Sequence, residues 1–256
     1  IKEANIGVSM GITGTDVAKE AADVILLDDN FATMVAAIEE GRVIYKNIRK
    51  FIRYLLSCNV GEVMTMFLGM LFGLPVILLP IQILWINLVT DGLPAIARGL
   101  DPADSNVMDE SPRSPDEGVF AGGLFITIII RGMVIAACTV FIFMMLYKQP
   151  EDLALARTGA FMTLVMTQLI HVFECKSETK SIFRMQLGNN KWLIGAAFIS
   201  LLMILAAIYV PVLQNIFNTV ALPYYTVVVI ILISMTGPLV NAILLKTGRK
   251  PKYKVS

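Results

Sequence analysis

Five oxygen-bearing side chains stand in two stretches that are otherwise largely apolar. Asn59 and Glu62 are spaced i and i+3, and Asn87, Thr90 and Asp91 are spaced i, i+3 and i+4. Each set would therefore share one face of a helix. The five groups are carboxylates, amides and a hydroxyl, which suit hard cations, and Ca²⁺ takes six to eight such oxygens. The pattern predicts a site for a hard cation between two helices.

The two carboxylates are expected inside a membrane. Glu62 lies close to the middle of the apolar window 51–74, and Asp91 lies within the window 81–97. A carboxylate at the centre of a bilayer costs about 2.5 kcal/mol or more. Two of them on adjacent spans would be tolerated if they shared a cation or were protonated. The alternative is an interhelical hydrogen-bond network that only holds the helices together.

The composition also indicates a membrane protein. Of the 256 residues, 56% are hydrophobic and 16% are charged, whereas soluble domains average about 25% charged residues. The net charge of +1 points to no acidic partner and no nucleic acid. The spacing of Cys58, Cys138 and Cys175 fits no zinc or redox motif, so they are interpreted as small packing residues.

Six windows are long enough, or nearly long enough, to cross a bilayer as helices, which takes about 20 apolar residues. They are 51–74, 81–97, 120–146, 153–173, 192–212 and 224–245. The second is short: Pro80 begins it, and Gly92-Leu93-Pro94 is expected to break it. Such a break would free backbone carbonyls for a cation.

Lysines and arginines set the expected orientation. They cluster just before the first window, between the fourth and fifth, and after the sixth, which places both ends in the cytoplasm. Arg131, inside the third window, is interpreted as snorkelling to the headgroups, with a functional intramembrane charge as the alternative. For His171, packing or interfacial hydrogen bonding is expected.

The first 40 residues have a different pattern. Apolar runs at 6–10 and 24–27 predict two buried strands, with a helix between them capped by Thr13 or Thr15 and another helix from Phe31 running almost continuously into the first window. This is an α/β pattern. Two strands are too few for a stable sheet, so we expect the end of a larger domain and a cut at the first residue. The helical link would push or tilt the first span, or serve as a plain tether.

Several segments resemble the P-type ATPases, and specifically the calcium pumps of the sarco/endoplasmic-reticulum type. Residues 1–11 and 14–23 resemble the end of the phosphorylation domain. Asn59-Val60-Gly61-Glu62 and 87–95 resemble the fifth and sixth membrane helices, and 108–109 with 112–115 resemble the loop that follows. Sodium/potassium pumps typically have an acid where Asn87 stands.

The resemblance implies a mainly α membrane protein. Residues 41–256 would supply helices five to ten of a ten-helix transporter, and residues 1–40 would end an α/β, haloacid-dehalogenase-like phosphorylation domain. The family exports cations from the cytoplasm, here Ca²⁺, by ATP hydrolysis through an aspartyl-phosphate. The metal ligands implied are Asn59, Glu62, Asn87, Thr90, Asp91 and Gln168.

Other parts of such a pump lie outside the chain. No catalytic or cofactor-binding residue is expected within it, and ATP, Mg²⁺ and a further ion-ligating glutamate would belong to the N-terminal half. The expected setting is a multi-pass protein in the lipid bilayer of the cell membrane. Two alternatives stay open: a pump for Mn²⁺ or another cation, and a non-catalytic truncated membrane regulator.

The number of ions per cycle depends on a departure from the family pattern. Two-ion pumps have Glu where Gln168 stands. Two Ca²⁺ would bring four positive charges against three carboxylates: Glu62, Asp91 and the glutamate of the other half. That imbalance favours one ion, whereas the retained Glu62 favours two, since single-ion members often lack it. The prediction is one ion per ATP.

Overall fold

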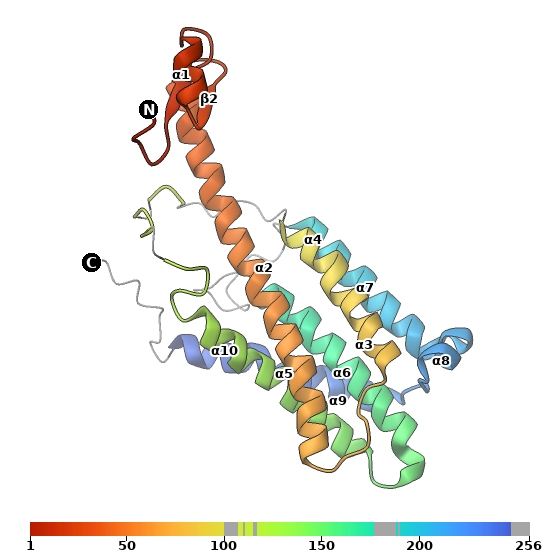
Figure 1. Ribbon diagram of the computed structural model, residues 1–256. Coiled ribbons are helices and arrows are strands. Elements are labelled where there is room, and N and C mark those ends of the chain that lie inside the picture. Colours follow the sequence, from red (N-terminus) through yellow and green to blue (C-terminus); the bar gives the residue numbers. More distant parts are fainter. Residues whose placement is uncertain (100–106, 110, 115–116, 177–187, 189, 247–256) are drawn as a thin grey trace. The chain divides into compact units, whose positions relative to one another are not determined.

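The computed structural model describes residues 1–99, 107–109, 111–114, 117–176, 188 and 190–246 (Figure 1). The chain divides into two compact units. The first comprises residues 1–46 with 103–113, and the second comprises 47–102 with 114–256. Each is described by itself.

The first unit contains a parallel pair of strands. β1 (Val8–Met10) and β2 (Val24–Leu26) pair in parallel, with α1 (Asp16–Ala21) between them in the chain. The side chain of Thr15 caps α1 by accepting a hydrogen bond from the backbone N–H of Ala18, as Thr residues at this position commonly do. The predicted strands, the helix and the Thr15 cap are confirmed.

Asp29 ties the loop after β2 to the loop after β1. Its carboxylate accepts hydrogen bonds from the backbone N–H groups of Ile12 and Thr13 at 2.8 and 2.7 Å. These bonds favour the charged form and lower the pKa of Asp29.

Helix α2 (Phe31–Leu71) is a single element of 41 residues, which confirms the predicted helix that continues into the first window. It ends because Gly73 adopts φ +64°, and the N–H groups of Gly73 and Leu74 turn back to the carbonyls of Met70 and Gly69. This is a common glycine-terminated helix end. The last three residues of the window 51–74 are therefore a turn, not helix.

The second predicted span is not broken at Gly92-Leu93-Pro94, and that prediction is wrong. The structure has α3 (Pro80–Ile86), a π-helix η1 (Asn87–Gly92) and α4 (Leu93–Gly99) in direct succession. The chain accommodates Pro94 by widening the preceding turns to π geometry, in which each N–H bonds five residues back.

The remaining helices of the second unit follow in order along the chain. They are α5 (Leu124–Leu146), the 3-10 helix η2 (Pro150–Asp152), α6 (Leu153–Glu174), α7 (Lys191–Tyr209), α8 (Pro211–Phe217), α9 (Tyr224–Ser234) and α10 (Thr236–Lys246). The last predicted span is therefore two helices that meet at Met235.

Five helical segments in the described part of the chain are long and apolar enough to cross a membrane. They are 31–71, 124–146, 150–174, 191–209 and 224–242. The apolar part of the second predicted span, Pro80–Thr90, is shorter than these, so the count of six spans remains a prediction.

Helix α6 is the centre of the second unit. It packs along α5 and also contacts α7, α9 and α10, while α4 lies beside α7 (Figure 1). Fully buried side chains such as Phe143, Phe161 and Ile204 form the core between them. Helices α2 and α5 approach closely at Gly61 and Gly132, where a Cβ on either residue would collide with side-chain atoms of the other helix. Glu62 follows directly after this close contact.

Candidate cation site between three helical segments

Glu62 is the centre of the candidate site. Its side chain lies on α2 and the residue is only 6% exposed. The amide of Gln168, on α6 and fully buried, donates from Nε2 to Oε1 of Glu62 at 2.9 Å. Two residues 106 positions apart are thereby brought together inside the helical unit.

Asn87 reaches the same carboxylate from the first turn of the π-helix. With its amide nitrogen turned toward Glu62, as the hydrogen-bonding groups around it require, Nδ2 lies 3.0 Å from Oε2 and 3.1 Å from Oε1. Glu62 is thus held by amide donors from two other helical segments, and three of the six predicted ligands are in direct contact.

The other three predicted ligands are placed differently. Thr90 is fully buried, and its hydroxyl donates to the carbonyl of Ile86 at 2.9 Å, so its oxygen lone pairs are still able to accept a cation. Asn59 is exposed on α2, one turn before Glu62. Asp91 lies in the π-helix, but its side chain falls outside the described part of the structure.

Gln168 carries an unused acceptor. Its Oε1 is buried and receives no hydrogen bond within the described residues. A buried amide oxygen without a donor is costly, and an amide oxygen is also a normal Ca²⁺ ligand. Among the described residues, no three His, Cys, Asp or Glu side chains come together as a metal cluster. Among the described side chains, a cation at Glu62 would therefore meet mainly amide and hydroxyl oxygens.

The backbone of the π-helix is held by hydroxyls from neighbouring helices. Tyr54, on α2, donates its phenolic O–H to the carbonyl of Thr90 at 2.9 Å. Ser200, on α7, donates to the carbonyl of Val89 at 2.7 Å. Neither residue was singled out in the sequence. The available signal was Pro94, which has no N–H and leaves carbonyls that need another donor.

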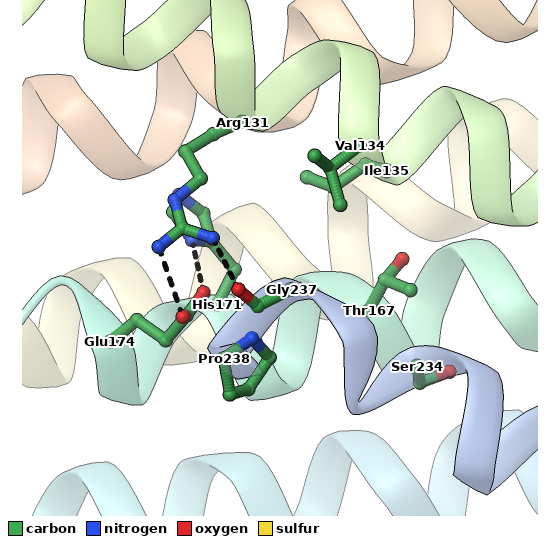
Figure 2. Close-up of a pocket in the computed structure, with 9 residues that line it drawn as sticks. All are labelled: Arg131, Val134, Ile135, Thr167, His171, Glu174, Ser234, Gly237 and Pro238. Carbon is green, nitrogen blue, oxygen red and sulfur yellow. Dashed lines mark hydrogen bonds and ion pairs between the residues drawn. The ribbon is translucent and has the colours of Figure 1, made fainter. Parts of the chain in front are cut away.

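A second polar cluster joins α5, α6 and α10. Arg131 donates from Nη1 to the carbonyl of Gly237 at 2.7 Å, and its Nη2 lies 3.1 Å from Oε1 of Glu174 (Figure 2). Arg131 is 2% exposed and Glu174 is 1% exposed. The interpretation of Arg131 as a snorkelling residue is wrong, because a buried carboxylate on the next helix pairs with it.

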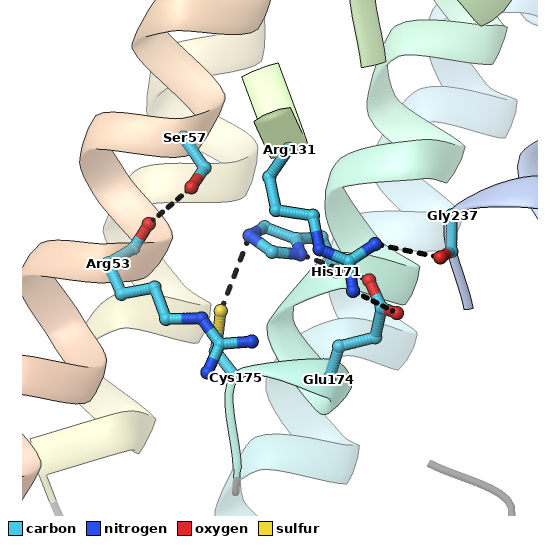
Figure 3. Close-up of polar contacts among 7 residues, drawn as sticks. All are labelled: Arg53, Ser57, Arg131, His171, Glu174, Cys175 and Gly237. Carbon is cyan, nitrogen blue, oxygen red and sulfur yellow. Dashed lines mark hydrogen bonds and ion pairs between the residues drawn. The ribbon is translucent and has the colours of Figure 1, made fainter. Parts of the chain in front are cut away.

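His171 extends this cluster. Its Nδ1 lies 3.1 Å from Oε2 of Glu174, and its Nε2 lies 3.3 Å from Sγ of Cys175 (Figure 3). A neutral imidazole that donates from Nδ1 and accepts the thiol proton at Nε2 satisfies both contacts. The expectation of hydrogen bonding for His171 is confirmed, although the residue is buried. Cys58, Cys138 and Cys175 are buried thiols, in agreement with their interpretation as packing residues.

The cavity beside Arg131 is too small for a substrate. It measures about 10 Å³ and is lined by Thr167, Ser234 and Pro238 as well as by the cluster itself (Figure 2). This is room for about one water molecule. The described geometry thus offers a filled ion pair at one place and an amide-lined carboxylate at another.

Known proteins with similar sequences identify the family of the chain. Residues 75–246 match the family described as cation transporting ATPase, C-terminus. The chain is 58% identical over 223 residues to a calcium-transporting ATPase of Bacillus subtilis, covering 87% of this chain and 25% of that protein. It is 45% identical over 260 residues to calcium-transporting ATPase 1 of Bacillus cereus, covering 95% and 29%.

A plant protein matches over the whole length of the chain. It is the endoplasmic reticulum-type calcium-transporting ATPase 2 of Arabidopsis thaliana, 35% identical over 313 residues, covering 100% of this chain and 30% of that protein. The chain therefore spans between a quarter and a third of the length of these relatives. Since the family model matches most of it, the chain belongs to the cation-transporting ATPases, as their C-terminal membrane region.

Proposed function

We propose that the chain is the membrane-embedded C-terminal part of an ATP-driven pump that exports Ca²⁺ from the cytoplasm. The observation that carries this is the buried carboxylate of Glu62, reached by the amides of Asn87 and Gln168 from two other helical segments. The names of the relatives, which are calcium-transporting ATPases, support Ca²⁺ as the cation.

The amides explain how one site serves both an empty and a loaded state. When no cation is bound, Asn87 and Gln168 turn their N–H₂ groups toward Glu62. A half-turn of each amide replaces nitrogen by oxygen at nearly the same place. Together with Glu62, these oxygens form part of a Ca²⁺ shell. Asn59, Thr90 and Asp91 complete the proposed ligand set, with Asp91 supplying the second charge.

The chain supplies ion ligands and depends on the rest of the pump for chemistry. ATP, Mg²⁺ and the aspartyl-phosphate would belong to parts upstream of residue 1, with residues 1–40 closing the phosphorylation domain. Both ends would face the cytoplasm, in the cell membrane. Expressed alone, the 256 residues should take up no acid-stable label from ATP.

The ligand role is tested by calcium-dependent phosphorylation of the complete pump that carries this chain. Glu62→Gln and Asp91→Asn should each raise the Ca²⁺ concentration for half-maximal phosphorylation by about 30-fold or more, because each removes a charged ligand worth roughly 2 kcal/mol. Glu151→Gln, at an exposed carboxylate in η2, is the matched control. Unchanged calcium dependence in Asp91→Asn and Glu62→Gln would exclude the proposed site. Competition by Mn²⁺ in the same assay separates a calcium pump from a manganese pump.

The proposed stoichiometry is one Ca²⁺ per ATP, since Gln168 adds an oxygen but no charge. Equilibrium ⁴⁵Ca²⁺ binding per phosphorylatable site should give a value near one for the unmodified pump. Gln168→Glu, which restores the acid of two-ion pumps, is measured alongside it. A value near two in the unmodified pump would refute the one-ion assignment and leave Gln168 as an adequate neutral ligand.

A further inference from the structure

Pro94 removes the one backbone N–H that could have reached either of two carbonyls of the π-helix. In an α-helix the N–H of residue i bonds the carbonyl of residue i−4, and in a π-helix it bonds the carbonyl of residue i−5. For position 94 these carbonyls belong to Thr90 and Val89. Proline has no N–H to give to either of them.

Both of these carbonyls receive a hydroxyl from another helix. Tyr54 donates to Thr90 at 2.9 Å, and Ser200 donates to Val89 at 2.7 Å. All four residues are fully buried, so water is not an alternative partner. A buried carbonyl without a donor is costly, and the two hydroxyls supply donors at the two carbonyls that an N–H at position 94 could have reached.

Ser200 differs from most buried Ser and Thr residues of the described bundle. Most of them donate to a carbonyl of their own helix four positions back, as Ser and Thr commonly do in membrane helices, although Thr219 donates to the carbonyl of Ala207. Those that donate within their own helix include Ser57, Thr65, Thr139, Thr163 and Ser234. Ser200 reaches instead across to η1. The missing N–H of Pro94 accounts for this bond, because the carbonyl of Val89 lies five residues before the proline and accepts from Ser200 instead.

We infer that Tyr54 and Ser200 are positioning residues that hold the segment Asn87–Gly92 in π register around Pro94. This inference rests on the proposed function, because the segment carries the ligands Asn87, Thr90 and Asp91. The π register changes the direction of each side chain relative to an α-helix. It therefore sets which of these groups meet Glu62, and loss of the hydroxyls lets the segment slip out of the ion-binding arrangement.

The test is calcium-dependent phosphorylation of the complete pump carrying Tyr54→Phe or Ser200→Ala. Each should raise the Ca²⁺ concentration for half-maximal phosphorylation about three- to tenfold, as expected for one lost hydrogen bond. The phosphorylation level at saturating Ca²⁺ should not change. Ser200→Thr, which keeps the hydroxyl, should restore near-normal affinity. If Ser200→Ala is not recovered from membranes, Ser200→Cys, with its weak S–H donor, is measured in its place.

Matched controls remove a buried or half-buried hydroxyl elsewhere. Ser234→Ala loses a bond to its own helix, and Tyr209→Phe loses a bond to the carbonyl of Leu222 in the loop before α9. Both should leave the calcium dependence within about twofold of the unmodified pump.

Pro94→Ala makes the test specific. It returns one N–H to position 94, which can be shared between the two carbonyls as a bifurcated donor, so each carbonyl depends less on its hydroxyl. In the Pro94→Ala background, Tyr54→Phe and Ser200→Ala should each shift the half-saturating Ca²⁺ concentration less than about twofold.

Three outcomes would overturn the inference: variants that behave like the controls, variants that lower only the maximal phosphorylation, or full-sized effects that persist in the Pro94→Ala background. The variant Glu62→Gln distinguishes failure of the positioning role from failure of the proposed function. If Glu62→Gln loses calcium dependence while the hydroxyl variants do not, the ion site stands and the positioning role fails. If Glu62→Gln has no effect, the proposed ion site itself fails.

Discussion

Two buried carboxylates in the same helical unit, Glu174 and Glu62, have different kinds of hydrogen-bond partner. Glu174 is held by the guanidinium of Arg131 and the imidazole of His171, both at 3.1 Å. The partners that the structure gives for Glu62 are the amides of Asn87 and Gln168. Both acids are almost completely buried, at 1% and 6% exposure.

Under the proposed function, the difference separates a structural site from an ion-binding site. A guanidinium brings a permanent positive charge that balances Glu174 at all times, and breaking such a buried pair is costly. An amide brings a dipole without net charge. It donates hydrogen bonds to Glu62 without neutralising the carboxylate, which is what the proposed binding and release of an ion requires.

The largest expected effect comes from breaking the permanent pair. Arg131→Met should destabilise the complete pump by about 3–5 kcal/mol, because Glu174 would keep its buried charge without its hydrogen-bonded cation. Thermal unfolding in detergent measures this. Arg157→Met is the control, since Arg157 is half-buried and donates only to the carbonyl of Val76. The double change Arg131→Met/Glu174→Met should recover most of the lost stability. If Arg131→Met and Arg157→Met are equally stable, the Arg131–Glu174 ion pair does not stabilise the protein as proposed.

The next effect is stabilisation by Ca²⁺ itself. At a free Ca²⁺ concentration about 100 times the dissociation constant, the unmodified pump should gain roughly 2.7 kcal/mol of stability. Glu62→Gln, which binds Ca²⁺ about 30-fold more weakly or worse, should keep at most about 0.9 kcal/mol of this gain. His171→Phe, which alters only the Glu174 cluster, should keep it. If both variants respond to Ca²⁺ alike in the same melting experiment, the contrast between the two carboxylates is wrong.

The smallest effect should come from the neutral partner of Glu174. His171→Phe removes one hydrogen bond and should cost about 1 kcal/mol in the absence of Ca²⁺, well below the cost of Arg131→Met. Cys175→Ala, which removes only a weak thiol donor, should cost less still. A loss for His171→Phe as large as that for Arg131→Met would mean that the imidazole, too, carries a charge that Glu174 needs.

Local patterns in the sequence predicted much of the secondary structure. Apolar windows marked the long helices to within a few residues, and the Thr15 cap and the two strands were found where expected. These features depend on near neighbours in the chain, and periodicity records such neighbours directly. The oxygen-bearing residues Glu62 and Asn87 were selected because such groups are rare in apolar helices.

Long-range partners could not be predicted in the same way. The sequence shows Arg131 as a charge in an apolar window, but nothing near it identifies Glu174 as its partner. Snorkelling was therefore the reasonable and incorrect interpretation. The π-helix was missed for a related reason: a proline such as Pro94 breaks a helix unless donors arrive from elsewhere, and Tyr54 and Ser200 lie far away in the chain.

The Arg131 cluster also has a consequence for how the protein is made. Arg131 leaves the ribosome before its partners, since Glu174 follows 43 residues later and Gly237 follows 106 residues later. Until then the charge of Arg131 raises the free energy of placing α5 in the hydrocarbon region by about 2.5–3.5 kcal/mol. The high apolarity of α5 lets the helix enter the bilayer despite this cost. Biosynthesis should therefore keep α5 near the insertion machinery until α6 arrives, and the final helix pair should complete its release into lipid.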